Sequence, residues 1–348
     1  MKQVMSTFRK LRRIIGLGSL AALIANPSSA QGVPKAAAGE TEIWFSPVAW
    51  EISKVTHGID YTAHDFQKLL LRDAPWQRAA AHTHVVLLPA NVVWSYPDRQ
   101  AVVRFFHDHG FETAFSFGML FDDGQCPKGI EGVSQDHDFN HEAVKIAKLW
   151  KDAGGNLDYV LMDAPLGYGH FIVPSCSHPI DDVARRAAAT FNHIRSYFPG
   201  VRAVDAEGPA RLPDTEWFVM MDSWLDAFRK HTGQSIDLVA LDLHWRDLRP
   251  GNSWQETTRR SVVFFHERGV RTGLIINDDR VGPGVTNISW MDANRRHVDD
   301  VAHRGGLGLD CILFSSWMGY PRDNLPEDNP DAYTSLVDYA FHKLHPRN

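Results

Sequence analysis

The sequence predicts a single (β/α)8 barrel, and three observations lead to that prediction. Eight short apolar runs recur along the chain at nearly even spacing. An amphipathic helical stretch follows nearly every run, as expected of parallel strands joined by crossover helices. Polar residues stand at the C-terminal ends of most runs, which is the end of such a barrel that carries the chemistry. The runs are IWFSP, VVLLPAN, TAFSFGML, YVLMDAP, RAVDAEGP, LVALDLHW, GLIINDD and CILFSSW.

The N-terminal segment has the order of a secretory signal peptide. A basic stretch precedes an apolar run at residues 14–25, and small residues then offer a cleavage site before Gln31. This pattern is too short to span a bilayer and is typical of a leader that is removed, here residues 1–30. We expect residues 31–40 to form a flexible segment and residues 41–348 to form the barrel.

The charge of the chain restricts its partners. Removing residues 1–30 removes five cationic side chains and no acidic one, so the formal charge of −6 becomes about −11. An acidic chain is a poor binder of nucleic acid or anionic membrane. No later apolar run approaches the ~20 residues that cross a bilayer. We expect a secreted or periplasmic protein with no membrane attachment after leader removal and, since no phosphate-binding motif occurs, no nucleotide or other cofactor.

The first four units contain the longest loops. Apolar residues at helical spacing predict a helix that begins near Asp98, and Gly110 is a suitable stop. The loops at residues 121–140 and 165–179 follow strands three and four, and we expect them to wall one side of a cleft. The predicted strands are 42–47, 85–89, 113–120 and a run ending at Asp163, and the predicted helices are a short one that includes residues 66–71, one from about 98, and 141–153.

The last four units are tighter. Their apolar runs alternate with helical stretches at short intervals, which leaves no residues for a second domain. The predicted strands are 201–206, 238–243, 271–276 and 312–316, and the predicted helices are 180–198, 213–231, 254–268, 290–303 and 332–344.

Two acidic residues at the ends of neighbouring strands suit glycoside cleavage. This reaction needs one carboxylic acid to protonate the departing oxygen and a second carboxylate that attacks or activates water. Asp163 and Glu207 end strands four and five, where their carboxyl groups would lie about 5 to 6 Å apart, near the ~5.5 Å of retaining enzymes. Glu207 would be the proton donor, with a pKa raised by an apolar wall, and Asp163 would attack.

Further polar residues on the same rim are candidates for substrate binding. Asp242 and His244 share one face of strand six, because residues two apart on a strand point the same way. Asp242 would bind a sugar hydroxyl or replace Asp163 as the second catalytic carboxylate. After strand seven, either Asp278 or Asp279 would face the substrate. Asp205 shares its face with Glu207 and would tune it or be buried and hydrogen-bonded.

Aromatic residues near the strand ends indicate a carbohydrate partner, because flat rings pack against the apolar faces of sugars. The chain has eleven Trp, a high number. We favour Trp245 and Trp317 as sugar platforms, and the other aromatic candidates for substrate binding are Trp50, Trp94, Tyr168 and Tyr320.

On these residues the chain resembles secreted glycoside hydrolases with a (β/α)8 barrel, over essentially the whole mature sequence. The α-amylase-like group has an Asp nucleophile on strand four, a Glu acid/base on strand five and an Asp stabiliser on strand seven. The resemblance implies these roles for Asp163, Glu207 and Asp278 or Asp279. The chain departs from that group at Leu161, where the group has Arg, and at Asn277, where the group has His.

Two other functions fit parts of the pattern. A glycan-binding barrel without catalysis would keep Trp245 and Trp317 and tolerate loss of the acids. A metal-dependent esterase or deacetylase would use His170 and His244 with Asp163 or Asp242 as ligands. We expect no metal site and favour hydrolysis of a poly- or oligosaccharide.

The three cysteines are expected to differ in role. Cys126 and Cys176 lie in neighbouring loops on one rim, where an oxidising compartment favours a disulfide. Cys311 begins strand eight and is expected to be a small buried apolar side chain.

Overall fold

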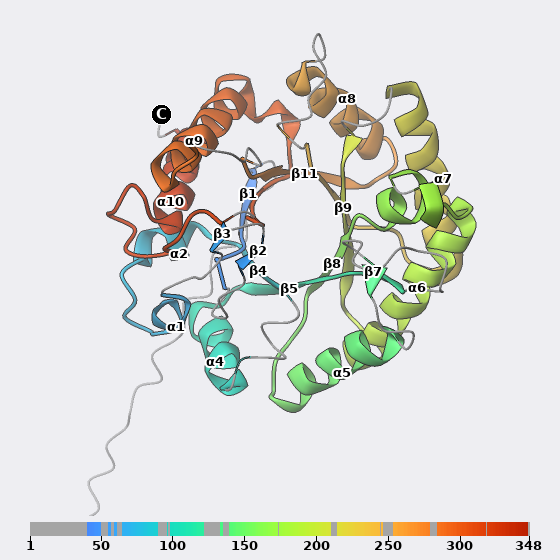
Figure 1. Ribbon diagram of the computed structural model, residues 1–348, viewed down its shortest axis with the longest axis horizontal. Coiled ribbons are helices and arrows are strands. Elements are labelled where there is room, and N and C mark those ends of the chain that lie inside the picture. The colour runs from blue at the N-terminus through green and yellow to red at the C-terminus, as the bar shows by residue number, and fades with distance from the viewer. Residues whose placement is uncertain are drawn as a thin grey trace, which may run out of the picture. The chain divides into compact units, whose positions relative to one another are not determined.

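Eight parallel strands close into a barrel in the computed structural model, with helices arranged around the outside (Figure 1). This confirms the predicted fold class. Going round the barrel, each strand pairs with the next in chain order, and the last strand pairs with the first. The structure describes residues 40–49, 55–56, 59–60, 65–89, 96, 98–121, 133–134, 139–172, 174–209, 214–243, 245, 253–278, 284–317 and 319–346.

The barrel strands lie close to the predicted runs. The strands at 85–89 and 271–276 were predicted with the observed bounds, because each is rich in β-branched residues and leucine. The barrel strands are β1 (Glu42–Phe45), β4 (Val85–Pro89), β5 (Glu112–Phe117), β8 (Tyr159–Asp163), β9 (Arg202–Glu207), β10 (Leu238–Leu241), β11 (Arg271–Ile276) and β12 (Cys311–Phe314).

Helices connect the strands and cover the outer surface of the barrel (Figure 1). Two short strand pairs lie in the connections: antiparallel β2 (Val55–Thr56) with β3 (Ile59–Asp60), and parallel β6 (Leu120–Phe121) with β7 (Val133–Ser134). The helices are α1 (Phe66–Leu69), α2 (Gln77–His82), α4 (Arg99–His109), α5 (Phe139–Asp152), α6 (Ile180–Tyr197), α7 (Asp214–Thr232), α8 (Trp254–His266), α9 (Asn287–His303) and α10 (Tyr333–Leu344), with the short turns η1 (Gly167–Phe171), η2 (Pro174–Cys176) and η5 (Gly305–Gly308).

Alternate residues of each strand face either the barrel interior or the helices, because side chains of a strand alternate in direction. The interior cluster includes Trp44, Leu161, Val204 and Leu313, all at most 5% exposed. The residues between them, such as Val160, belong to the larger cluster packed against the helices. Both faces of the barrel strands are therefore apolar and buried, as in other parallel sheets covered by helices.

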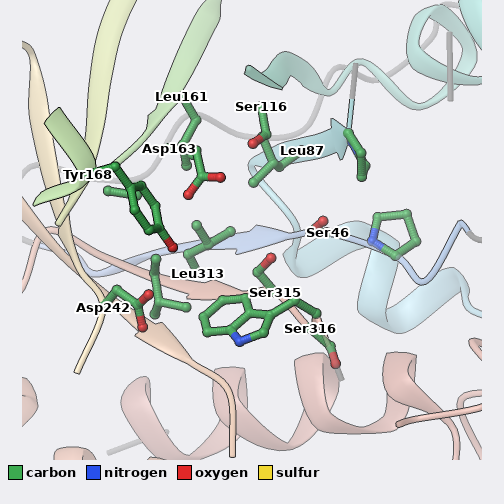
Figure 2. A pocket seen from close by; sticks show the side chains of 15 residues that line it. Ser46, Leu87, Ser116, Leu161, Asp163, Tyr168, Asp242, Leu313, Ser315 and Ser316 are labelled. Carbon is green, nitrogen blue, oxygen red and sulfur yellow. The ribbon is translucent and has the colours of Figure 1, made fainter. Parts of the chain in front are cut away.

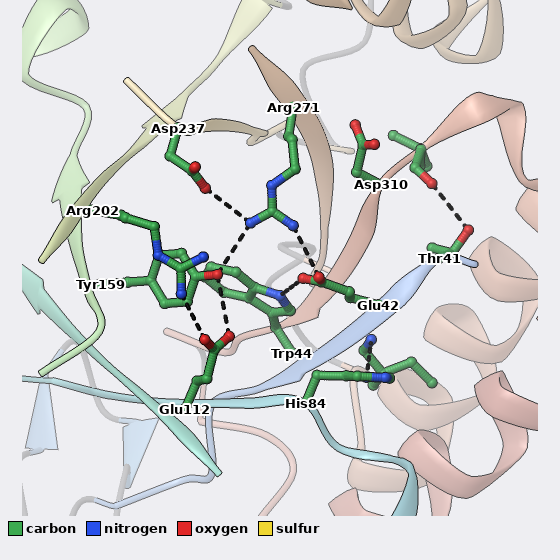
Figure 3. Close-up of polar contacts among 12 residues, drawn as sticks. Thr41, Glu42, Trp44, His84, Glu112, Tyr159, Arg202, Asp237, Arg271 and Asp310 are labelled. Carbon is green, nitrogen blue, oxygen red and sulfur yellow. Dashed lines mark hydrogen bonds and ion pairs between the residues drawn. The ribbon is translucent and has the colours of Figure 1, made fainter. Parts of the chain in front are cut away.

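A network of charged and aromatic side chains fills the N-terminal end of the barrel (Figure 3). Arg271 forms ion pairs of 3.0 Å with Glu42 and Asp237 and donates a hydrogen bond to the hydroxyl of Tyr159. Arg202 stacks on the Tyr159 ring, with its guanidinium carbon 3.8 Å from the ring centroid. These groups are partly buried and satisfy one another, so they close this end of the barrel.

Several predictions concern residues outside the described ranges. The signal peptide and the segment at 31–40 lie almost wholly there, so they stay predictions that N-terminal sequencing of the exported protein would test. No helix within the described ranges is long and apolar enough to cross a membrane. Cys126 also lies outside these ranges, and only the backbone of Cys176 is described, so the predicted disulfide stays untested. Cys311 is fully buried at the start of β12, as predicted.

Candidate active site

A cavity of about 200 Å³ opens at the C-terminal end of the barrel (Figure 2). Its floor is the last apolar layer of the barrel interior, and its walls carry carboxylates, hydroxyls and aromatic rings. Sites of chemistry in this fold lie at this end. The lining residues are Ser46, Pro47, Leu87, Pro89, Ser116, Leu161, Asp163, Tyr168, Ala206, Asp242, Ile275, Leu313, Ser315, Ser316 and Trp317.

Two carboxylates, Asp163 and Asp242, reach this cavity from opposite sides of β9. Asp163 is the last residue of β8 and pairs with Ala206, whereas Asp242 directly follows β10. Main-chain bonds fix both positions, since the N–H of Ala164 donates to Ala206 O at 2.9 Å and the N–H of Asp242 donates to Glu207 O at 2.8 Å. Figure 2 shows both carboxylates directed into the cavity, with the Tyr168 ring on the same side.

Glu207 does not face this cavity, so the prediction that it would do so beside Asp163 is wrong. Its neighbour Ala206 takes the inward direction, and Glu207 therefore points toward the helices. The side chain is fully buried. Its carboxylate accepts hydrogen bonds from the main-chain N–H groups of Leu166 at 2.7 Å and Gly167 at 3.1 Å.

A second buried carboxyl, Asp205, lies on the same helix-facing side of β9. It accepts a 2.7 Å hydrogen bond from the indole N–H of Trp224. Burial raises the pKa of Asp205 to about 7, against the lowering effect of the Trp224 bond. Burial, and then the charges of Asp205 and Asp163, raise the pKa of Glu207, although the Gly167 and Leu166 amides oppose the rise. The contacts of the two carboxyl groups with the surrounding helical layer confirm that Asp205 shares the face of Glu207 on β9.

The predicted aromatic residues divide into two groups. Trp317 and Tyr168 line the cavity, whereas their contact with a substrate stays a prediction. Trp245 is not in its wall: the indole stacks on His297 with ring centroids 3.7 Å apart and packs edge-on against Trp254. Tyr320 is also absent from the lining, and its hydroxyl donates to Val285 O at 3.1 Å. Neither side chain lines this cavity, and their predicted contact with a substrate stays a prediction.

Of the two acidic residues predicted after β11 as alternatives for the substrate-facing position, only Asp278 lies within the described ranges. Asp278 is 1% exposed and does not line the cavity. Three residues earlier, Ile275 faces inward and lines the cavity, so the alternation along the strand directs Asp278 to the opposite face. Four other predicted binding residues lie outside the described ranges, so their placement stays a prediction: Trp50, Trp94, His244 and Asp279.

Sequence reasoning missed the hydroxyl groups of the cavity wall. Ser46, Ser116 and Ser315 each lie in the wall, two residues beyond an inward-facing apolar residue. In the sequence, Ser46 and Ser315 each stand at the end of an apolar run. Ser46 lies two residues after Trp44 and Ser315 two residues after Leu313, so each serine faces inward like the residue two before it. Such groups can donate and accept hydrogen bonds with sugar hydroxyls.

Across the described ranges, no three His, Cys, Asp or Glu side chains gather closely enough to form a metal site. His170, one of the predicted ligands of the alternative esterase, instead uses its Nδ1 for a 2.7 Å contact with His178 O.

No protein-family model matches the chain, and no curated protein matches it. Among solved structures, it is similar to a GH10 endoxylanase from a sugarcane soil metagenome, with 12% identity, a TM-score of 0.52 and coverage of 86% of this chain and 97% of that chain. It is also similar to the GH53 catalytic domain of Ignisphaera aggregans, with 11% identity, a TM-score of 0.52 and coverage of 90% and 98%. A fungal β-1,4-galactanase shares 10% identity, with a TM-score of 0.50 and coverage of 86% and 99%. These similarities establish the barrel fold.

Proposed function

We propose that this protein is a glycoside hydrolase that acts on a poly- or oligosaccharide, with Asp163 and Asp242 as its two carboxylates. The observation that carries the proposal is that both side chains line one cavity at the C-terminal end of the barrel. Trp317 in the same wall offers a flat apolar face for a sugar ring, and the serine hydroxyls offer hydrogen bonds. The barrels of similar fold named above include a xylanase and a galactanase, which supports the same class of reaction.

The spacing of the two strands suits a two-carboxylate reaction. Asp163 and Asp242 belong to strands on either side of β9, and neighbouring strands lie about 4.8 Å apart, so the two backbones are about 9 to 10 Å apart. Their side chains project inward from a curved wall, which brings the carboxyl groups closer together than the backbones. Two-carboxylate glycosidases work at separations of about 5 to 9.5 Å.

We assign the ionised role to Asp163 and the proton-donor role to Asp242. Asp163 keeps the attacking role that its place at the end of β8 suggested, and Asp242, directly after β10, takes the proton-donor role because Glu207 does not line the cavity. Asp163 would attack the anomeric carbon or activate a water, and Asp242 would protonate the departing oxygen.

Activity measurements on a panel of polysaccharides, including β-1,4-xylan and β-1,4-galactan, test this proposal. We expect Asp163→Asn and Asp242→Asn each to lower kcat by about 10²- to 10⁴-fold, the usual contribution of an acid or base. Asp226→Asn is the matched control, because Asp226 is an exposed carboxylate on α7. Substantial turnover by either cavity variant would refute the assignment. Glycan binding without turnover by the unaltered protein would instead identify a non-catalytic binding barrel.

A further inference from the structure

The turn that follows β8 is under conformational constraint right beside the cavity. Ala164, the residue after Asp163, has a φ of 41°, in the left-handed region that non-glycine residues avoid. Such a conformation costs about 1 to 3 kcal/mol and persists only where surrounding contacts impose it. Gly167–Phe171 then form a π-helix, a geometry often found at functional sites. This turn carries Tyr168 into the cavity wall.

Glu207 supplies the contacts that hold the start of this turn. The first N–H groups of a helical segment have no partner within the segment and need an acceptor from elsewhere. Oε1 of Glu207 accepts from Leu166 N at 2.7 Å and from Gly167 N at 3.1 Å, and Oε2 lies 3.2 Å from Gly167 N. The turn is therefore anchored to the end of β9 by a fully buried side chain.

Close packing on both sides of Tyr168 completes the anchoring. A Cβ atom on Gly167 would lie 3.0 Å from Oε2 of Glu207 and 2.8 Å from Cδ1 of Ile172. A Cβ atom on Gly169 would lie 2.8 Å from Leu120 and 2.9 Å from Val183. A side chain at either glycine would therefore require its neighbours to shift. The glycines let the backbone on either side of Tyr168 approach its neighbours closely.

We infer that Glu207 is a positioning residue, which acts on the reaction by holding the turn that carries Tyr168 in place without touching the substrate. Its carboxylate anchors the turn that carries Tyr168, and its main-chain O accepts the N–H of Asp242. The inference rests on the proposed function for its effect on catalysis. The anchoring itself is a property of the fold and can be measured separately.

Hydrogen exchange tests the anchoring without a substrate. We expect Glu207→Ala to speed exchange of the Leu166 and Gly167 amides by about tenfold or more, because it removes their only acceptor side chain in the described structure. Glu207→Gln keeps an acceptor oxygen and should change this exchange by less than about threefold. Asp226→Asn is the control, since it alters an exposed carboxylate on α7. Unchanged exchange in Glu207→Ala would overturn the inference.

Kinetics of a double-mutant cycle test the link to catalysis. A misplacement of about 1 Å near reacting groups can cost about 10²-fold in rate. We expect Glu207→Ala to lower kcat by about this factor with little change in KM, and to lower it by less than about tenfold in a Tyr168→Phe background. Glu207→Gln should restore most of the lost kcat. Independent, multiplying effects of the two substitutions would overturn the link to Tyr168.

Different results would refute the proposed hydrolase function and the positioning role of Glu207. If Glu207→Gln is as inactive as Asp163→Asn, Glu207 is a catalytic acid and the positioning inference is wrong. If Asp163→Asn and Asp242→Asn stay active, the proposed function is wrong, whereas an exchange effect confined to Glu207→Ala would still establish the anchoring.

Discussion

Asp205 makes the stability of this protein depend on pH in a direction that can be measured. The side chain is fully buried, and its only hydrogen bond within the described structure comes from Trp224. Burial raises its pKa from 3.8 to about 7. The folded protein therefore binds this proton more tightly than the unfolded chain does. The stabilising contribution is complete below about pH 3.8 and is lost as the pH rises through about 7.

The size of the stability change follows from the shift in the pKa of Asp205. A change of about three pKa units corresponds to about 4 kcal/mol, at 1.36 kcal/mol for each unit. This is a large share of the 5 to 15 kcal/mol typical of a folded protein. Asp205→Asn keeps an oxygen that accepts from Trp224 and carries no charge at any pH. The variant should match the parent protein near pH 4 and exceed its free energy of unfolding by up to about 4 kcal/mol at pH 8.

Urea denaturation followed by tryptophan fluorescence at pH values from 4 to 8 gives the required free energies. The quantity to compare is the difference between the variant and the parent at each pH, which cancels the contributions of titrating groups that do not interact with Asp205. The difference includes the change in Glu207, whose pKa the charge of Asp205 raises. Asp226→Asn, on the exposed face of α7, should give a difference that does not change with pH. If the Asp205→Asn difference is equally flat, or if the variant is less stable at pH 8, the carboxyl is ionised in the fold and the reasoning fails.

Two further substitutions give measurable outcomes. Asn324→Ala removes three buried hydrogen bonds of 2.9 Å, two with the backbone of Val48 and one with Asp65, so urea denaturation should show a loss of about 3 kcal/mol. Asp328→Asn on the same loop is the control: it breaks only an exposed ion pair and should lower the free energy of unfolding by less than about 1 kcal/mol. An equal loss of stability in the two variants would contradict the importance of the buried Asn324 hydrogen bonds. Trp317→Ala should weaken glycan affinity about tenfold in calorimetry, about 1.4 kcal/mol, and unchanged affinity would remove it from the binding surface.

The barrel could be predicted because its signal is repeated in every unit. An apolar run of strand length followed by a helical pattern occurs eight times, so an error in one boundary does not alter the fold. The helix predicted at 290–303 illustrates such an error, since it begins at Asn287. Its start is set by Thr286. The Thr286 side chain accepts a hydrogen bond from the N–H of Ser289, and the Ser289 hydroxyl oxygen accepts one from the N–H of Thr286. Serine at this position is a weaker signal than the usual Glu or Gln of a capping box.

The direction of each rim side chain was harder to predict than its position along the chain. Strands of this barrel are buried on both faces, so an alternation of polar and apolar residues does not mark the inward face. In β9, Val204 and Ala203 are equally apolar and equally buried, although only Val204 points into the barrel. A shift of one residue in this assignment moves Glu207 from the cavity to the helix layer. The same ambiguity explains why Asp163 was placed correctly and Glu207 was not.

A carboxylate at the end of a barrel strand has two physically reasonable destinations, and this protein uses both. An inward carboxylate meets the substrate cavity, as Asp163 and Asp242 do. An outward one meets the helix layer, where the unpaired N–H groups of a helical turn attract a negative or hydrogen-bond-accepting group. Glu207 takes this second place at the turn after β8. Because Glu207 lies outside the cavity, the proposed catalytic pair belongs to strands two apart, with the small side chain of Ala206 between them in the cavity wall.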